Sequence, residues 1–240
     1  MRHKTINATV PESLKNAVSD ESFSVFTNAS ENELEPVELL ILDEIGDDWF
    51  GEGVSAKSVV GFLDKHRGRD VNVRINSPGG LVYDGLVIYN ALATHDAPVT
   101  VTIDGLAFSA ASFIAMAGDT IRMHEASDIG IHRSMGLAMG NAKTARGLAE
   151  WLDVIDEHLV EIYSRRTGQP RNQIEKWLDG TDDGTLFSAK DAVEFGFADE
   201  LIPLKTKPAD SGQRAESRKR IAASLAHQRS KVLNYRHRLA

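Results

Sequence analysis

The sequence predicts an α/β fold in which most of the strands pair in parallel. Short β-branched runs alternate with helical patterns along the chain, and this alternation is typical of parallel sheets with crossover helices. The clearest strands are Val71–Ile75 and Val99–Ile103, separated by a helical stripe over residues 83–94. A chain of 240 residues, 42% of them hydrophobic, can bury one sizeable core, so we expect one main domain.

Flanking patterns extend this alternation on both sides. Val37–Ile45 contains a first strand, and Ser55 is placed to cap a helix that runs to about Lys65. Two more short strands are predicted at Ile121–Met123 and Ile129–Ile131. The spacing of these elements fits a doubly wound sheet and a spiral of ββα units equally well, so it leaves both architectures open.

The longest helical pattern covers residues 141–166. Its apolar side chains recur at three- and four-residue steps, as on one face of a helix: Leu148, Leu152, Ile155, Leu159 and Ile162. A short helix is predicted over 171–178. Another helix opens at Ser188, where Asp191 occupies the position that Glu or Gln takes in a capping box.

Charge and composition divide the chain into three parts. Residues 1–36 form a polar leader that we expect to be flexible, and 37–204 form the main domain. Residues 205–240 hold ten Lys or Arg against two acidic residues, a net of +8, so the total of −8 leaves −16 on residues 1–204. An acidic body argues against nucleic acid as its partner. The basic tail, helical or disordered, is expected to dock on an acidic partner or to be trimmed by the protein itself.

The composition also limits the chemistry. The chain has no cysteine, which excludes a disulfide framework, a thiolate nucleophile and a Cys-based zinc site. No stretch has a signal-peptide pattern or the length of a membrane span, so we expect a cytoplasmic protein without a membrane partner. No Gly-x-x-x-x-Gly-Lys-Ser/Thr motif is present, and no cofactor or metal is predicted.

Ser109 is the first candidate for a catalytic residue. The strand Val99–Ile103 is followed by Gly105, which we expect to break it, and by an Ala-rich helical run over Ala110–Ala117. Ser109 therefore lies at the start of a helix, where free backbone N–H groups favour developing negative charge. Its hydroxyl could attack a carbonyl there. The alternative is an ordinary N-cap, a position that serine favours for structural reasons.

Two further segments support the catalytic interpretation. The strand that begins at Val71 runs into Ser77-Pro78-Gly79-Gly80, where a glycine pair lets the backbone approach a ligand and offer an N–H group. Downstream, a short apolar strand ends at His132, a candidate base. Taken singly, the glycine pair could be an ordinary turn and the histidine a structural residue.

Together these motifs resemble the ClpP family of serine peptidases. The resemblance rests on 76–80, on Gly105-Leu106-Ala107-Phe108-Ser109 and on Ile131-His132, and it covers roughly 37–203. The segment 47–54 makes the chain most similar to the ClpP-related head-maturation proteases of tailed bacteriophages. The resemblance implies the ClpP/crotonase-like spiral of ββα units, with the long helix projecting from the head and building a subunit interface.

The resemblance also implies the roles of the site residues. Ser109 is the nucleophile, and His132, 23 residues later, is the base. The backbone N–H groups of Gly80 and Ala110 are the oxyanion donors, and Gly79 with Gly80 forms a substrate-binding loop. The family places an aspartate four residues before the serine that opens the next helix.

Here the sequence departs from the family pattern. The position four residues before Ser188 holds Gly184, so the third member of the triad is expected one residue earlier, at Asp183, with Asp182 as the alternative. A third reading of the same segment is a solvated Asp-Asp-Gly turn.

The expected function is therefore a serine endopeptidase that assembles into a homo-oligomeric ring. Its expected substrates are scaffold and capsid proteins during phage head maturation. The alternatives are a housekeeping ClpP-like protease that works with a separate ATP-dependent unfoldase, and a crotonase-fold acyl-CoA enzyme.

Other rivals fit the residues less well. His124 competes with His132 as the base. A Ser–Lys peptidase would need a lysine near Ser109, yet none occurs between Lys65 and Lys143. A non-catalytic assembly protein would not need the serine, the histidine and the glycine pair together.

Overall fold

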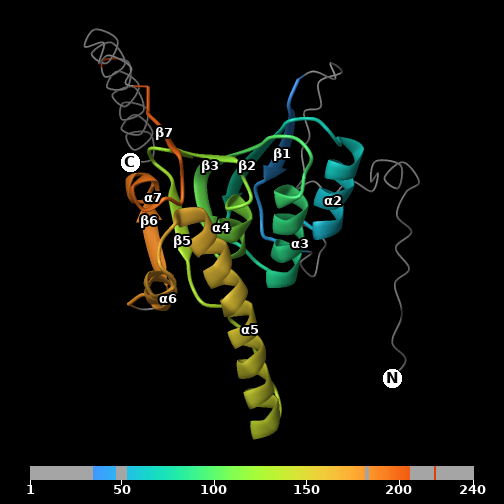
Figure 1. Ribbon diagram of the computed structural model, residues 1–240, viewed down its shortest axis with the longest axis vertical. Helices are drawn as coiled ribbons and strands as arrows, with labels where there is room; N and C mark the ends of the chain where they lie inside the picture. The colour runs from blue at the N-terminus through green and yellow to red at the C-terminus, as the bar shows by residue number, and fades with distance from the viewer. Residues whose placement is uncertain (1–34, 47–52, 182–183, 206–218, 220–240) are drawn as a thin grey trace, which may run out of the picture. The chain divides into compact units, whose positions relative to one another are not determined.

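A seven-stranded sheet forms the centre of the body (Figure 1). The computed structural model describes residues 35–46, 53–181, 184–205 and 219. The strands are β1 (Val37–Ile41), β2 (Val71–Ser77), β3 (Val99–Phe108), β4 (Thr120–His124), β5 (Asp128–Ile131), β6 (Thr185–Ser188) and β7 (Glu200–Ile202). All of the pairings between these strands are parallel except that of β5 with β6. The predicted α/β fold with parallel pairing is confirmed.

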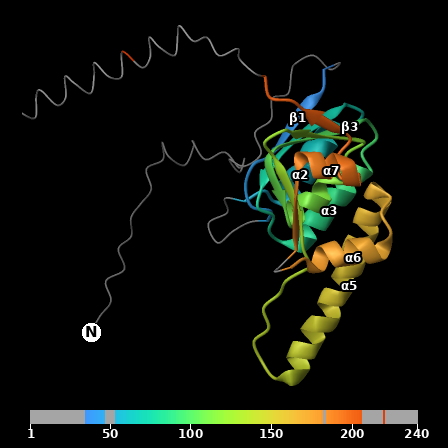
Figure 2. The same cartoon turned by 90° about the vertical axis from the view of Figure 1, so that its left-hand side faces the viewer.

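Helices connect the strands and cover the sheet. They are α2 (Ala56–Lys65), α3 (Val82–Ala93), α4 (Ala110–Ala115), α5 (Ala142–Thr167), α6 (Arg171–Asp179) and α7 (Ala189–Phe195). The C-terminal half of α5 packs on the body, whereas its N-terminal half projects away from it (Figures 1 and 2). The predicted projecting helix is therefore confirmed. The predicted capping box of Ser188 and Asp191 opens α7.

Strand β3 divides the sheet into two branches. Its first half pairs with β4 over Thr100–Ile103, and its second half pairs with β5 over Leu106–Phe108. The expectation that Gly105 ends this strand is wrong. Leu106 N–H donates to Asn76 Oδ1 at 3.1 Å, and a Cβ at Gly105 would lie 2.6 Å from the same atom. Gly105 thus permits a close approach to a neighbouring side chain while the strand continues.

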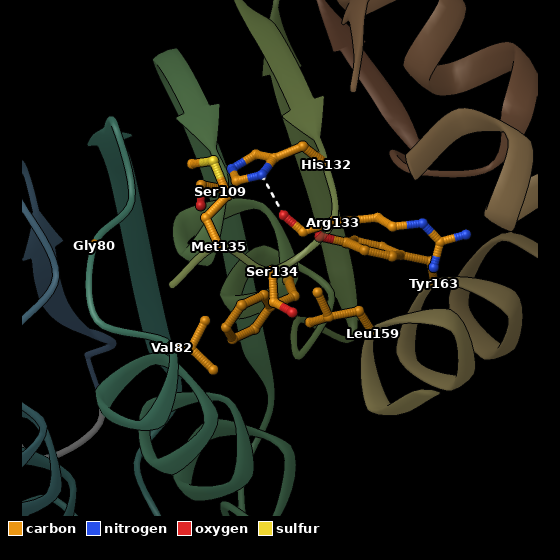
Figure 3. A pocket seen from close by; sticks show the side chains of 10 residues that line it. Gly80, Val82, Ser109, His132, Arg133, Ser134, Met135, Leu159 and Tyr163 are labelled. Carbon is orange, nitrogen blue, oxygen red and sulfur yellow. Dashed lines mark hydrogen bonds between the residues drawn. The ribbon is translucent and has the colours of Figure 1, made fainter. Parts of the chain in front are cut away.

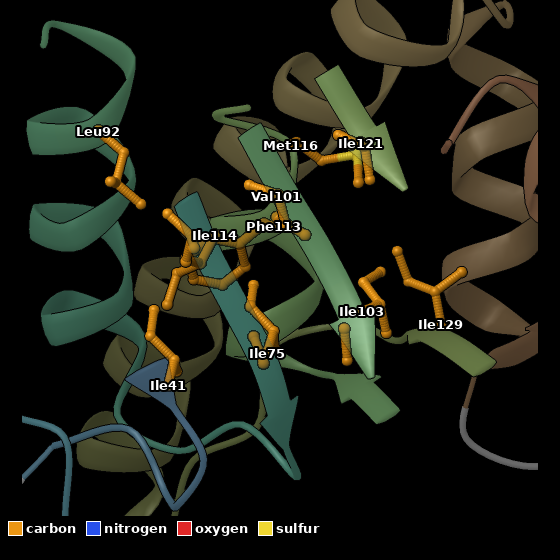
Figure 4. Packing of buried hydrophobic residues seen from close by; sticks show 14 of the residues in the cluster. Ile41, Ile75, Leu92, Val101, Ile103, Phe113, Ile114, Met116, Ile121 and Ile129 are labelled. Carbon is orange, nitrogen blue, oxygen red and sulfur yellow. The ribbon is translucent and has the colours of Figure 1, made fainter. Parts of the chain in front are cut away.

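The core lies between the sheet and the helices (Figure 4). Alternate residues of β1, β2 and β3 are buried because successive side chains of a strand point to opposite faces. All six residues of α4 are buried, Phe113 and Ile114 among them. Because α4 is packed against its surroundings on all sides, it also holds the preceding residue, Ser109, in place. The helix ends at Ala115, two residues before the predicted end.

Several expectations fall on parts of the chain outside the described residues. These are nearly all of the leader 1–36, most of the segment 47–54 and nearly all of the tail 205–240. The described residues up to Pro203 form one compact unit, and the boundary of this unit lies between Pro203 and Leu204. Within the described residues, no helix combines the length and the apolar character needed to cross a bilayer.

Candidate active site

Ser109 adopts a strained backbone conformation between β3 and α4. Its φ of 54° and ψ of −124° make it the one non-glycine residue with positive φ in the described part of the chain. Its N–H donates to the carbonyl of Gly130 at 3.0 Å, and its side chain forms no capping hydrogen bond. Ser109 thus occupies the N-cap position of α4 but does not use its hydroxyl as a cap. Strain of this kind is costly and persists where the surrounding structure enforces it, which is typical of active sites.

The glycine loop after β2 lies directly against this turn. A Cβ at Gly79 would be 2.6 Å from both the carbonyl oxygen of Phe108 and Cβ of Ser109, and 2.8 Å from the nitrogen of Ala110. The φ of Gly79 is +94°, a conformation that side chains other than glycine rarely adopt. Glycine is thus required here for close approach to the candidate nucleophile, which an ordinary surface turn would not need.

The second glycine is held by the segment that follows β1. Ile45 N–H donates to the carbonyl of Gly79 at 2.7 Å, and Leu81 N–H donates to the carbonyl of Ile45 at 2.8 Å. Between these two bonds, the N–H of Gly80 has no acceptor among the described residues. Gly80 lines the same pocket as Ser109. The predicted role of Gly80 as an oxyanion donor requires an N–H group that is available at this place.

His132 lies at the end of β5 and lines that pocket too (Figure 3). The residue is 8% exposed, and its ring stacks on Phe108 with the ring centroids 5.1 Å apart. Nδ1 lies 2.6 Å from the carbonyl oxygen of Arg133. Because a carbonyl only accepts, the proton of the neutral ring is on Nδ1, and Nε2 is then left as the acceptor. This is the tautomer that a general base beside a serine needs.

The other candidate base lies elsewhere. His124 ends β4, and its Nε2 is 3.5 Å from Asp104 Oδ1. It does not line the pocket that Ser109 and His132 share, and among the described residues no lysine lines that pocket either. The structure thus brings the predicted serine and the predicted histidine together without the two rivals.

The structure describes only part of the segment that is expected to hold the third member of the triad. Asp182 and Asp183 lie outside the described residues, but Gly184 is described. A Cβ at Gly184 would be 2.2 Å from the carbonyl oxygen of Ile131 and 2.5 Å from Cβ of His132, at a φ of +110°. An aspartate at the family position would therefore clash. The residue directly after Asp183 nevertheless contacts the candidate base.

The pocket beside Ser109 combines apolar and polar walls. Its apolar lining comes from α3, α4, α5 and the segment after β5: Val82, Phe113, Leu159, Tyr163 and Met135. The polar side chains of Ser109, His132, Arg133 and Ser134 complete it. Such a pocket suits an apolar substrate side chain with a polar reacting group at one end.

Sequence reasoning missed an ionic network directly after His132. Arg133 donates through Nε to Asp179 Oδ1 at 2.5 Å and through Nη1 to Asp156 Oδ2 at 3.2 Å. The hydrogen bond from Arg133 lowers the pKa of Asp179, and the same bond raises the pKa of the Arg133 guanidinium. Asp156 is 7% exposed and follows the buried Ile155. An acidic residue beside the apolar stripe of a helix was the signal in the sequence that could have revealed it.

Most of the chain is similar to known proteins. A protein-family model described as Clp protease matches residues 38–205. The chain is 36% identical over 136 residues to "ATP-dependent Clp protease proteolytic subunit 2" of Parasynechococcus marenigrum. It is 37% identical over 138 residues to "ATP-dependent Clp protease proteolytic subunit 1" of Gloeobacter violaceus. Each match covers 56% of this chain and 68% of the relative.

A solved structure shares the fold. A ClpP1 mutant from Listeria monocytogenes superposes with a TM-score of 0.60 at 23% identity, over 70% of this chain and 92% of that chain. This likeness identifies the ClpP-like fold and thereby excludes the doubly wound sheet that the spacing of elements had left open.

Proposed function

Because this chain belongs to the Clp protease family, we propose that it is a serine endopeptidase in which Ser109 is the nucleophile and His132 the general base. The observation that carries the proposal is the strained backbone of Ser109 beside a histidine whose Nε2 is left as an acceptor. A serine at a helix start for structural reasons alone would use its hydroxyl as a cap and would need no such strain.

The catalytic cycle follows from these positions. Ser109 Oγ transfers its proton to His132 Nε2 and bonds to the carbon of the scissile carbonyl. The N–H groups of Gly80 and Ala110 hold the oxyanion of the tetrahedral intermediate. The imidazolium then gives its proton to the leaving amine as the C–N bond breaks. Water attacks the acyl-enzyme by the same route and restores Ser109.

Asp183 is the proposed third member of the triad, with Asp182 as the alternative. The support is indirect, since the close approach of Gly184 to His132 brings the chain that follows Asp183 to the base. A one-residue shift from the family position is needed because Gly184 has no room for a side chain. A carboxylate there would orient the imidazole and stabilise its charged form.

The substrates are proteins or peptides with an apolar side chain next to the scissile bond. Val82, Phe113 and Leu159 in the pocket wall support this preference. A positively charged substrate side chain would lose hydration there without gaining an acidic partner, because no Asp or Glu is among the described residues that line the pocket. Peptides that differ only at this position should therefore differ in kcat/KM.

The biological setting is proposed from the relatives. Their names describe ATP-dependent proteolytic subunits, which favours the alternative of a peptidase that works with a separate unfoldase. Nothing in the comparisons supports the expected role in phage head maturation, or a capsid or scaffold partner. Most of the segment 47–54 that suggested them lies outside the described residues. If the protein degrades a folded substrate only when an ATP-dependent unfoldase is added, this result would support a peptidase that works with an unfoldase.

A homo-oligomeric ring is proposed as the working form. Large apolar side chains are exposed on α3 and α5: Tyr83, Val87, Trp151 and Val154. The rings of Tyr83 and Trp151 are in contact, with their centroids 5.4 Å apart. Exposed apolar groups that gather in this way mark interaction surfaces. Light scattering on the purified chain would measure the mass directly, and a monomer at working concentration would contradict this part of the proposal.

Paired substitutions test the assignment of the base and the nucleophile. Ser109→Ala should abolish peptide cleavage while leaving the thermal unfolding midpoint near that of the wild type. His132→Ala should reduce kcat by several orders of magnitude. His124→Ala is the matched control, because His124 is also a histidine at a strand end but lies outside the pocket. Retained cleavage by Ser109→Ala would refute the proposal.

A further inference from the structure

The peptide group between Arg133 and Ser134 is held by a hydrogen bond at each end. Its carbonyl oxygen lies 2.6 Å from Nδ1 of His132, and its N–H donates to Asp156 Oδ1 at 2.7 Å. The C=O and N–H of a trans peptide group point in opposite directions within one rigid plane. Asp156 on α5 and the candidate base thus hold the same rigid group from its two sides.

Every hydrogen bond that Asp156 accepts from the side chains and backbone of the described residues beyond its own helix comes from this segment. Oδ1 accepts from both the N–H and the hydroxyl of Ser134, each at 2.7 Å, and Oδ2 accepts from Nη1 of Arg133 at 3.2 Å. The side chain is 9% exposed, next to the buried Ile155. A carboxylate in such surroundings is costly unless it is well paired. Its three donors come from the two residues that follow His132 and from nowhere else among the described residues.

The charge of Asp156 also acts on the carbonyl. A carboxylate that accepts the N–H of a peptide group polarises that group, which makes its carbonyl oxygen a stronger acceptor. The oxygen of Arg133 therefore holds the proton on Nδ1 of His132 more firmly. It also stabilises the imidazolium that forms when Nε2 takes the proton of Ser109.

We infer that Asp156 is a positioning residue for His132 and acts through the peptide group between Arg133 and Ser134. The inference rests on the proposed role of His132 and adds to it. It assigns part of the support of the base to the long helix α5, independently of the proposed contribution of Asp183.

Kinetics of two matched variants test the inference. Asp156→Asn removes the charge and keeps a side chain of the same shape, and it should lower kcat about 10-fold or more with KM within about twofold. Asp153→Asn makes the same chemical change on an exposed part of α5, one turn earlier, and should match the wild type. A wild-type kcat for Asp156→Asn would overturn the inference, as would a loss of activity that appears in KM alone.

A measurement on the wild-type protein tests the inference without relying on the correct folding of a variant. Nitrogen NMR of the labelled imidazole should show His132 protonated at Nδ1 in its neutral form, because that proton is donated to Arg133. Protonation at Nε2 would overturn the inference. Failure of the proposed function itself would look different: the wild-type protein would cleave no peptide, whatever the state of the ring nitrogens.

Discussion

The hydroxyl of Tyr163 lies 2.7 Å from Oγ of Ser112, in the buried space where α5 meets α4. Ser112 in turn donates to the carbonyl oxygen of Ser109 at 2.6 Å. A chain of two hydrogen bonds thus links α5 to the backbone of the candidate nucleophile. Asp156, seven residues earlier on α5 and therefore on the same face, holds the segment after the candidate base.

Tyr163→Phe should weaken this link without unfolding the protein. Loss of the hydroxyl removes one buried hydrogen bond, and we expect the free energy of unfolding to fall by about 1 kcal/mol. Ser112 keeps its bond to the Ser109 carbonyl, so the fold of the turn should survive. Urea denaturation followed by circular dichroism measures the difference, and a variant as stable as the wild type would show that the bond contributes nothing.

The same tyrosine predicts a loss of stability at high pH. Burial raises the pKa of the Tyr163 phenol, although its hydrogen bond with Ser112 acts in the opposite direction. The unfolded chain ionises near the ordinary value of about 10, while the folded chain keeps the proton. Stability is therefore fully present below that pH and falls as the pH rises above it. The stability advantage of the wild type over Tyr163→Phe should shrink between about pH 9 and pH 11, and a constant difference would contradict this.

Gly79→Ala should inactivate the protein. The added Cβ would lie 2.6 Å from Cβ of Ser109 at a φ of +94°, so either the glycine loop or the nucleophile turn has to move. Gly147→Ala is the control, because a Cβ there meets nothing within 4 Å and the residue is exposed in α5. That variant should gain up to about 1 kcal/mol of stability and keep full activity. Peptide cleavage and the thermal unfolding midpoint are measured for both variants. A Gly79→Ala protein that is folded but inactive has lost the geometry of the site and not the fold.

Asp183→Asn and Asp182→Asn together test the third member of the triad. We expect Asp183→Asn to lower kcat strongly, because an uncharged partner supports the imidazolium less well. Asp182→Asn should have little effect. The reverse result would move the role to Asp182. If both variants keep the wild-type kcat, neither aspartate is the third member of the triad. The carbonyl of Arg133 and Asp156 would then orient His132 without them.

Much of the fold was predictable because it depends on local patterns. Alternation of apolar residues in β2 and the stripe of α5 specify which side chains are buried, and the strand and helix follow from them. The end of β3 was not predictable in this way. Gly105 is a strand breaker by local propensity. The strand continues past it through contacts that are distant in sequence, namely the pairing of Leu106–Phe108 with β5 and the hydrogen bond from Leu106 to Asn76.

The site was predictable only in part for the same reason. Ser109 and His132 follow from motifs in which the neighbouring residues carry the signal. The support of the base does not, because Arg133, Asp156 and Asp179 come from three separate segments that only the folded chain brings together. The clash that excludes a side chain at Gly184 likewise depends on the backbone of Ile131, far away in sequence.

Labelling with a serine-reactive fluorophosphonate, followed by peptide mapping, tests the central claim most directly. The reagent reacts with a serine only where a base activates the hydroxyl and donors stabilise the negative charge that develops. The account predicts covalent label on Ser109 in the assembled wild-type protein and none in His132→Ala. Label on another serine, or equal labelling of Ser109 in the two proteins, would contradict it.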